Sequence, residues 1–331
     1  MSEALYLIWL SMIDGIGKHR MNALLSVFDS AENIYSAGRN ELRHISELKE
    51  RDVEKILSAR DLNKAEETLD KIKSLGISYV TLKDREYPPL LKEMSNPPVI
   101  IYVMGTLPNN SLTKISIIGS RRCSSYGADV TRTLTKNLID HNIVIVSGMA
   151  RGIDSIAHKT ALEYGGLTVA VLGCGLDICY PPENAELRGQ IINKGCIISE
   201  YLPGMWPAKH LFPERNRIIS GLSKIVIVTE ASLKSGTLIT ASHALEQNRE
   251  VMAVPGNITS ALSEGTNYLI SQGATVVTSY KDVLNTLNMP ALESHAEKPK
   301  ISSEGIQIEI DLYPTEKLDE DHPDDHPDDH P

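Results

Sequence analysis

Two kinds of hydrophobic spacing divide the chain. In the first 75 residues, apolar side chains recur three or four positions apart, as in Leu7 and Leu10 and in Leu24 and Phe28. This is the spacing of amphipathic helices. From about residue 114, short runs of β-branched residues alternate with glycine-rich turns and with stretches of helical length. The pattern predicts a helical domain followed by an α/β domain.

The apolar runs of the second region predict seven strands, at 115–120, 143–148, 168–173, 196–201, 224–231, 250–256 and 275–279. Runs of this kind are expected when helices cover both faces of a parallel sheet. Seventeen of the 22 glycines fall between 105 and 273, many of them just after a run. We therefore predict a doubly wound α/β fold that binds its ligand where the strands end.

The same patterns set the expected domain boundaries. Residues 1–75 form the helical domain, 76–110 a connector with two short apolar runs and two proline pairs, and 111–289 the α/β domain. The remaining segment, 290–331, carries thirteen acids and three bases, which accounts for the whole net charge of -10. We expect this tail to be disordered. Because the rest of the chain is neutral, the overall acidity does not exclude a nucleic-acid partner.

Composition narrows the possible classes of function. Hydrophobic residues make up 41% and charged residues 23% of the chain, enough for a sizeable core. No apolar stretch reaches the length of a membrane span. The four cysteines form no CxxC pair, and no histidine stands at zinc-finger spacing from them. We expect buried, reduced cysteines, and neither a metal nor a cofactor.

Loops after the predicted strands hold the first candidate residues. Arg121 follows the first strand and precedes a predicted helix, a position that favours a bound anion. The loop lacks the GxGxxG pattern and the acidic residue of a dinucleotide site, so phosphate held by side chains is the better interpretation. Five small residues of such loops are candidates for supporting an anion: Gly119, Ser120, Gly148, Gly152 and Gly236.

A long irregular segment, 202–221, is the most informative. Lys209, Phe212, Arg215 and Arg217 lie within nine positions of one another. Cations interleaved with an aromatic ring suit single-stranded nucleic acid, since the charges meet phosphates and the ring stacks on a base. We predict that these residues and Arg121 line one groove. The alternative left open is that Arg215 and Arg217 are structural, or that Glu214 pairs with one of these cations.

Seven motifs in order resemble the DNA-processing protein A family (DprA, also called Smf). They are GSRRCSSYG, SGMARGIDSIAH, GCGLDICYPPEN, SEYLPGMWP, FPERNRIISGLS, VTEASLKSGTLITA and VPGN, and the resemblance covers about 105–280. It implies an extended Rossmann-like sheet. The GIGKHR turn near the N-terminus resembles a helix-hairpin-helix turn, as in a small SAM-like domain. Such a turn could bring backbone amides to a phosphate, or be a simple connection between helices.

The resemblance also implies a function. Family members are cytoplasmic, bind and protect single-stranded DNA that enters during natural transformation, and load the RecA recombinase onto it. They act as homodimers and need no catalysis, and single-strand binding protein is a further expected partner. The family's DNA contacts fall on Arg121, Lys209 and Phe212 of this sequence, to which the charge pattern adds Arg215 and Arg217. Many members also carry a C-terminal winged-helix-like domain, and residues 290–331 are too few and too polar for one.

Two rival functions use the same loops. Nucleotide phosphoribohydrolases of the related superfamily use a PGGxGTxxE loop, but this chain has Ser235-Gly236-Thr237 without the double glycine and Thr240 where the glutamate would stand. A sensor of a nucleotide derivative would need a closed pocket instead. Release of free base from nucleoside monophosphates would identify the enzyme, and a ligand-induced rise in melting temperature would identify the sensor.

Overall fold

A nine-stranded sheet organises the chain in the computed structural model, which describes residues 2–290. The strand order is β1-β2-β6-β5-β4-β3-β7-β8-β9. The strands are β1 (Ser78–Thr81), β2 (Ile100–Gly105), β3 (Lys114–Ile118), β4 (Val144–Ser147), β5 (Thr168–Val171), β6 (Cys196–Ser199), β7 (Ile225–Val228), β8 (Glu250–Ala253) and β9 (Thr275–Val276). β1 pairs with β2, and β2 with β6, in antiparallel fashion, and the other neighbours are parallel. The predicted Rossmann-like α/β fold is confirmed.

Each of the seven predicted strands is present but ends one to three residues before its predicted end. The two apolar runs of the predicted connector form β1 and β2, which extend the same sheet at one edge. The chain runs outward from β3 to β6 and then returns to the other side of β3 with β7. Since β3 is the strand at which this direction reverses, the loops after β3, β4 and β5 open at the edge of the sheet where α/β proteins bind ligands.

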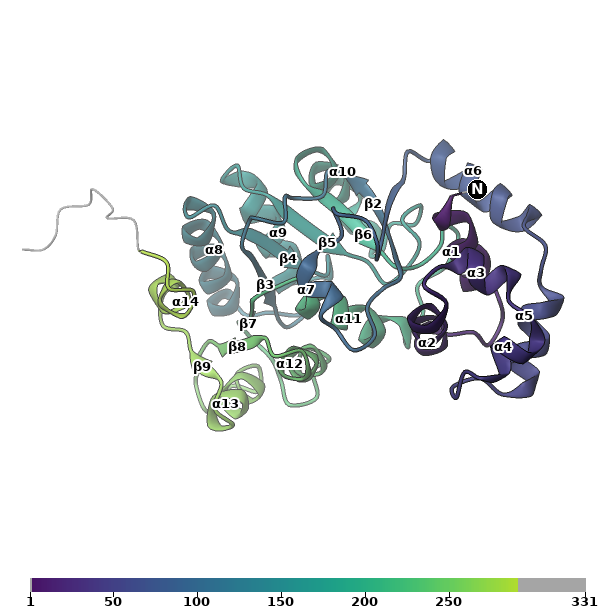
Figure 1. Ribbon diagram of the computed structural model, residues 1–331. Helices are drawn as coiled ribbons and strands as arrows, with labels where there is room; N and C mark the ends of the chain where they lie inside the picture. The colour runs from purple at the N-terminus through teal and green to yellow at the C-terminus, as the bar shows by residue number, and fades with distance from the viewer. Residues whose placement is uncertain (1, 291–331) are drawn as a thin grey trace, which may run out of the picture. The chain divides into compact units, whose positions relative to one another are not determined.

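Helices cover both faces of the sheet (Figure 1). Ile115, Ile117 and Ile145 point into a core formed with α8 (Ser125–Asp140) and α9 (Ile153–Glu163). Val144 and Val146 point into the opposite core, formed with α11 (Leu211–Gly221) and α12 (Thr237–Glu246). Both sides of the parallel strands are therefore apolar. The other helices after β1 are α7 (Pro89–Lys92), the 3-10 helix Pro182–Asn184, α10 (Ala185–Lys194), α13 (Glu264–Ser271) and α14 (Tyr280–Thr286).

Six helices precede the sheet, as the hydrophobic spacing predicts. They are α1 (Glu3–Ser11), α2 (Lys18–Phe28), α3 (Ala31–Ser36), α4 (Arg39–Arg43), α5 (Glu50–Ser58) and α6 (Asn63–Ser74). Their core is continuous with apolar residues of β2, β5 and β6, including Tyr102, Ala170 and Ile197. These helices therefore pack directly on one end of the sheet as part of one compact unit, and the expected domain boundaries at residues 75 and 110 stay a prediction. The acidic tail predicted to be disordered lies outside the described residues, apart from Pro290.

Candidate functional site

A small hollow lies where β3, β4 and β5 end, against the start of α11. Its lining includes Arg121, Arg151, Tyr180, Phe212 and Arg215. Three side chains lie close to the Phe212 ring. The Arg121 guanidinium carbon is 5.5 Å from its centroid and that of Arg215 is 6.0 Å from it. The Tyr180 ring centroid is 5.6 Å away. Three of the five predicted residues thus meet here, around one aromatic ring.

Glycines make room for this arrangement. A Cβ on Gly173 would lie 3.1 Å from the Phe212 ring, and one on Gly148 would lie 2.7 Å from the Arg215 guanidinium. Gly152 has a φ of +70°, and a Cβ there would stand 2.3 Å from the carbonyl oxygen of Ser120. The loop after β4 therefore lies directly against the loop after β3 because Gly152 has no side chain, and Arg215 of α11 lies against Gly148 for the same reason.

The backbone amides expected to support an anion are partly engaged within the protein. The Ser120 amide donates to the carbonyl of Glu230 at 2.7 Å, and the Gly148 amide donates to the Asp154 carboxylate at 3.2 Å. Gly119 packs against Ile153, and Gly236 lies exposed at the start of α12, outside the hollow. Phosphate recognition at this site would fall on side chains more than on these amides.

Arg215 is buried, with only 4% of its surface exposed. Its guanidinium donates to the carbonyl oxygens of Gly148, at 2.7 Å, and of Val171, at the ends of β4 and β5. Burial lowers the pKa of Arg215, and the nearby Asp154 carboxylate opposes that shift. An arginine remains charged in proteins even so. Its position fits a clamp that joins the ends of two strands and holds a cation beside Phe212.

Lys209 and Arg217 do not line the hollow around Phe212. Lys209 is exposed in the loop before α11, three residues from Phe212, and has no ion pair within residues 2–290. Arg217 lies five residues after Phe212 on α11, about 140° around the helix at 100° per residue. Arg217 is therefore directed away from the Phe212 ring, and the expected contact of Lys209 and Arg217 with DNA stays a prediction.

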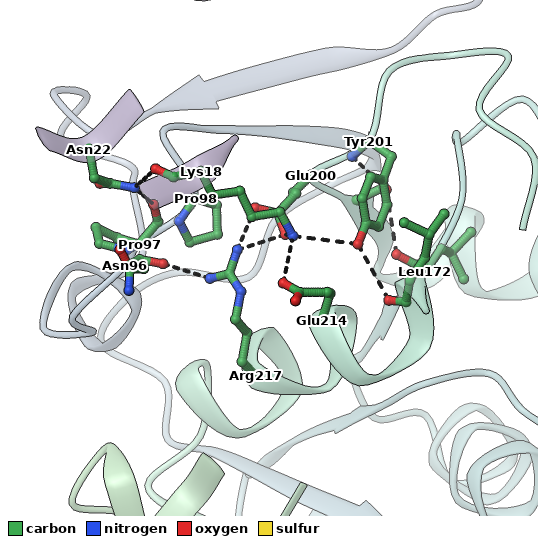
Figure 2. A network of polar contacts seen from close by, with 12 residues as sticks. Lys18, Asn22, Asn96, Pro97, Pro98, Leu172, Glu200, Tyr201, Glu214 and Arg217 are labelled. Atoms are coloured by element: carbon green, nitrogen blue, oxygen red, sulfur yellow. Dashed lines mark hydrogen bonds and ion pairs between the residues drawn. The ribbon is translucent and has the colours of Figure 1, made fainter. Parts of the chain in front are cut away.

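Arg217 instead belongs to an ion cluster next to the N-terminal helices, in which Arg217 and Glu200 are buried (Figure 2). It holds both carboxylate oxygens of Glu200, at 2.5 and 2.7 Å, and the carbonyl of Asn96 at 2.7 Å. Lys18 reaches the same Glu200 at 2.6 Å and Glu214 at 3.3 Å. Lys18 belongs to the GIGKHR turn, so this turn presents its lysine to carboxylates of the α/β domain. Within residues 2–290, Glu214 pairs with this lysine and with none of the three predicted arginines.

Sequence reasoning missed three residues of the site region. Glu230, only 2% exposed, accepts hydrogen bonds from the amide and hydroxyl of Ser124, and this fixes the loop that carries Arg121. Tyr180 stacks near Phe212, and Glu200 centres the ion cluster. An acid just after a buried apolar run was the available signal for Glu230 and Glu200. Nothing in the spacing paired Tyr180 with Phe212.

Neither cysteine nor histidine near the hollow has the character of a catalytic group. Burial raises the pKa of the Cys174 thiol to about 11, so it is protonated at neutral pH. His158 is fully buried, and its Nδ1 lies 2.6 Å from the hydroxyl of Thr168. Within residues 2–290 no three His, Cys, Asp or Glu side chains gather as a metal site. In the same part of the chain no helix is long and apolar enough to cross a membrane.

His158 should make the protein sensitive to acid. Burial lowers its pKa from 6.5 to about 3, so below pH 6.5 the unfolded chain binds a proton that the folded chain does not. The contribution of neutral His158 to the free energy of unfolding is fully present above pH 6.5. It falls as the pH drops below that value. Between pH 7 and pH 5 it should decrease by about 2 kcal/mol. Urea unfolding of the parent and of His158→Gln at both pH values checks this, and an equal pH dependence in the two proteins would contradict it.

The comparisons with known proteins agree with this architecture. The family model described as DNA recombination-mediator protein A matches residues 78–288. The chain belongs to this family. Protein Smf of Synechocystis sp. is 36% identical over 303 residues, which are 90% of this chain and 76% of that protein.

Two solved structures of relatives extend the comparison to three dimensions. DNA processing protein A (DprA) from Streptococcus pneumoniae superposes with a TM-score of 0.76 at 36% identity, covering 86% of this chain and 98% of that one. DprA from Helicobacter pylori, whose structure describes its binding of single-stranded DNA, gives a TM-score of 0.57 at 34% identity. That match covers 64% of this chain and 96% of the other.

Proposed function

We propose that this chain binds single-stranded DNA without catalysing a reaction on it. The observation that carries the proposal is the exposed Arg121 guanidinium held over the Phe212 ring at the ligand-binding edge of the sheet. A cation beside an aromatic ring offers charge to a phosphate and a π face to the adjacent base. The Helicobacter pylori relative binds single-stranded DNA, which supports the same ligand class here.

The residues divide into two roles in this proposal. Arg121 and Lys209 are exposed and contact phosphates, and Phe212 stacks on a base. Arg215 and Arg217 are engaged by carbonyls and by Glu200, so their expected contact with DNA stays a prediction and their main effect is on folding. Phosphoribohydrolase chemistry has less support, since Thr240 is buried in α12 and lies outside the hollow.

Binding should follow two distinct patterns among the variants. Lys209→Ala and Arg121→Ala should each reduce the slope of log affinity against log salt by about 0.7, because one phosphate contact is lost. Phe212→Ala should weaken binding by about 1–3 kcal/mol with little change in that slope, because base stacking releases few ions. Fluorescence anisotropy of a labelled oligothymidylate at several salt concentrations measures both quantities.

Two exposed residues away from the hollow are matched controls. Lys64→Ala, on α6, and Tyr164→Ala, at the end of α9, remove one cation and one ring without touching the site. Each should bind DNA like the parent. If Arg121→Ala, Lys209→Ala and Phe212→Ala also bind like the parent, or if duplex DNA binds as tightly as single strands, the proposed function is wrong.

We further propose the cellular role that the family resemblance implies: a cytoplasmic homodimer that protects incoming DNA in natural transformation, cooperates with single-strand binding protein and loads RecA. Two linked binding sites would raise the affinity for long strands through effective concentration. The direct assay is RecA filament formation on DNA coated with single-strand binding protein, with light scattering to give the oligomeric state. A monomer at micromolar concentration, or an unchanged rate of filament formation, would reject this role.

A further inference from the structure

Trp206 is exposed over 75% of its surface, whereas the chain's other tryptophan, Trp9, is 3% exposed. An indole is among the largest apolar side chains and usually buries most of its area. Trp206 lies in the loop between β6 and α11, three residues before Lys209 and six before Phe212. No contact so far described uses it.

The backbone next to Trp206 is held firmly. The carbonyl of Met205 accepts a hydrogen bond from the Gly175 amide at 2.9 Å, and the Gly204 amide donates to the Asp177 carboxylate at 2.8 Å. Pro207 follows directly and restricts the backbone of the residue before it to extended conformations. The exposed ring therefore stands on a rigid support, which reduces the entropy lost when a ligand orders it.

The hydrogen bond from Gly175 to Met205 connects this loop to the hollow around Phe212. Gly175, which anchors Met205, is two residues beyond Gly173, which lies against the Phe212 ring. Two residues span at most about 7 Å. A Cβ on Gly175 would stand 2.6 Å from the carbonyl of Leu202, so the two loops are in direct contact. Trp206 is thus presented from a loop that borders the hollow, and the exposed Lys209 separates it from Phe212 in the chain.

We propose that Trp206 is a second base-stacking platform for single-stranded DNA, beyond Phe212, with Lys209 meeting the phosphates between the two stacked bases. The inference rests on the proposed function and deepens it, because it gives the strand a path out of the hollow along the 202–210 loop. The π face of an indole accepts any base, so this platform adds affinity without sequence preference. A rigid exposed ring followed by an exposed lysine is what such a path needs.

The tryptophan itself reports the contact. Unlabelled oligothymidylate should quench the emission of the parent protein excited at 295 nm, because a stacked base contacts the indole directly. The buried Trp9, whose indole N–H donates to the carbonyl of Ala59 at 2.6 Å, should give a constant background. Trp206→Phe should abolish the quenching while keeping most of the affinity, since a phenyl ring still stacks.

The DNA affinities of Trp206 variants distinguish base stacking from a simple apolar contact. Trp206→Ala and Trp206→Leu should both weaken binding of a labelled oligothymidylate about tenfold, within the range for one stacked base. The salt slope should stay that of the parent, because no phosphate contact is lost. Tyr164→Ala is the control for loss of an exposed ring elsewhere. Melting temperatures of the variants should match the parent, because Trp206 is exposed.

The outcomes distinguish this inference from the function on which it rests. If the parent binds DNA in a Phe212-dependent manner but its emission does not change, and Trp206→Ala binds within twofold of the parent, Trp206 is not a platform and the proposed function stands. If Trp206→Leu binds like the parent, the contact is not stacking and the inference is wrong. If the parent binds no single-stranded DNA, both fail together.

Discussion

Replacing Arg215 by alanine is expected to lower the free energy of unfolding by about 4 kcal/mol. The guanidinium is buried and donates to the carbonyls of Gly148 and Val171 and to the side chain of Asn216. Alanine would leave these acceptors without their donor, remove the cation nearest the buried Asp154 carboxylate and open a cavity. A buried acceptor left without its donor costs about 1–3 kcal/mol, and truncation of a large buried side chain adds the cost of a cavity, so together they account for an effect of about 4 kcal/mol.

The measurement is urea unfolding of Arg215→Ala beside Arg121→Ala. The Arg121 side chain lies over the same Phe212 ring but is exposed, so its loss should change stability by no more than about 0.5 kcal/mol. DNA affinity of the two variants completes the comparison. Arg121→Ala should lose affinity and keep stability. An Arg215→Ala protein that is as stable as the parent but binds DNA poorly would show that Arg215 contacts DNA directly and is not a clamp.

Much of the fold was predictable because its signals are local. β3 to β8 are short apolar runs with a helix layer on each face of the sheet, so the composition of each run reveals its environment, whereas β9 is exposed at the edge. The loops after these strands had to meet at one edge of the sheet once the strands were parallel. That is why Arg121 and Phe212 could be placed together from the sequence.

The roles of the site residues were harder to predict. They depend on the direction in which each side chain points and on ion-pair partners far away in the sequence. Arg215 and Arg217 are two residues apart, so on a helix they are directed about 160° apart. The spacing of basic residues predicted one irregular basic segment through 209–217. In the structure α11 begins at Leu211, so most of these residues lie on a helix. Glu200 is paired with Lys18, 182 positions earlier in the chain, and no periodicity connects two such positions.

Glu200→Ala is expected to destabilise the protein by about 3 kcal/mol. The Glu200 carboxylate is 7% exposed and is held by Lys18 at 2.6 Å and by Arg217 at 2.5 Å. Removing it would leave Arg217, itself only 10% exposed, with the Asn96 carbonyl as its remaining described acceptor. An unpaired buried charge is strongly destabilising, even though an intact buried pair adds little net stability.

An exposed ion cluster in the helical domain is the matched control. Arg39 pairs with Glu50 and Glu54, and all three side chains are more than 40% exposed. Arg39→Ala should therefore cost less than about 1 kcal/mol. The destabilisation by Lys18→Ala should lie between those of Glu200→Ala and Arg39→Ala. Lys18 is 29% exposed, and Glu200 would remain paired with Arg217. Urea unfolding of the three variants ranks these effects.

Hydrogen exchange locates the effect of Glu200→Ala in the structure. Lys18 begins α2 of the helical domain, whereas Glu200 follows β6 and Arg217 lies on α11 of the α/β domain. The cluster joins the two parts, so its loss should raise the exchange rates of the α2 amides and of the Asn96 amide more than those of α8 and α9 on the far face. If Glu200→Ala is no more destabilising than Arg39→Ala, or if exchange rises equally everywhere, the cluster does not hold the helical domain against the sheet.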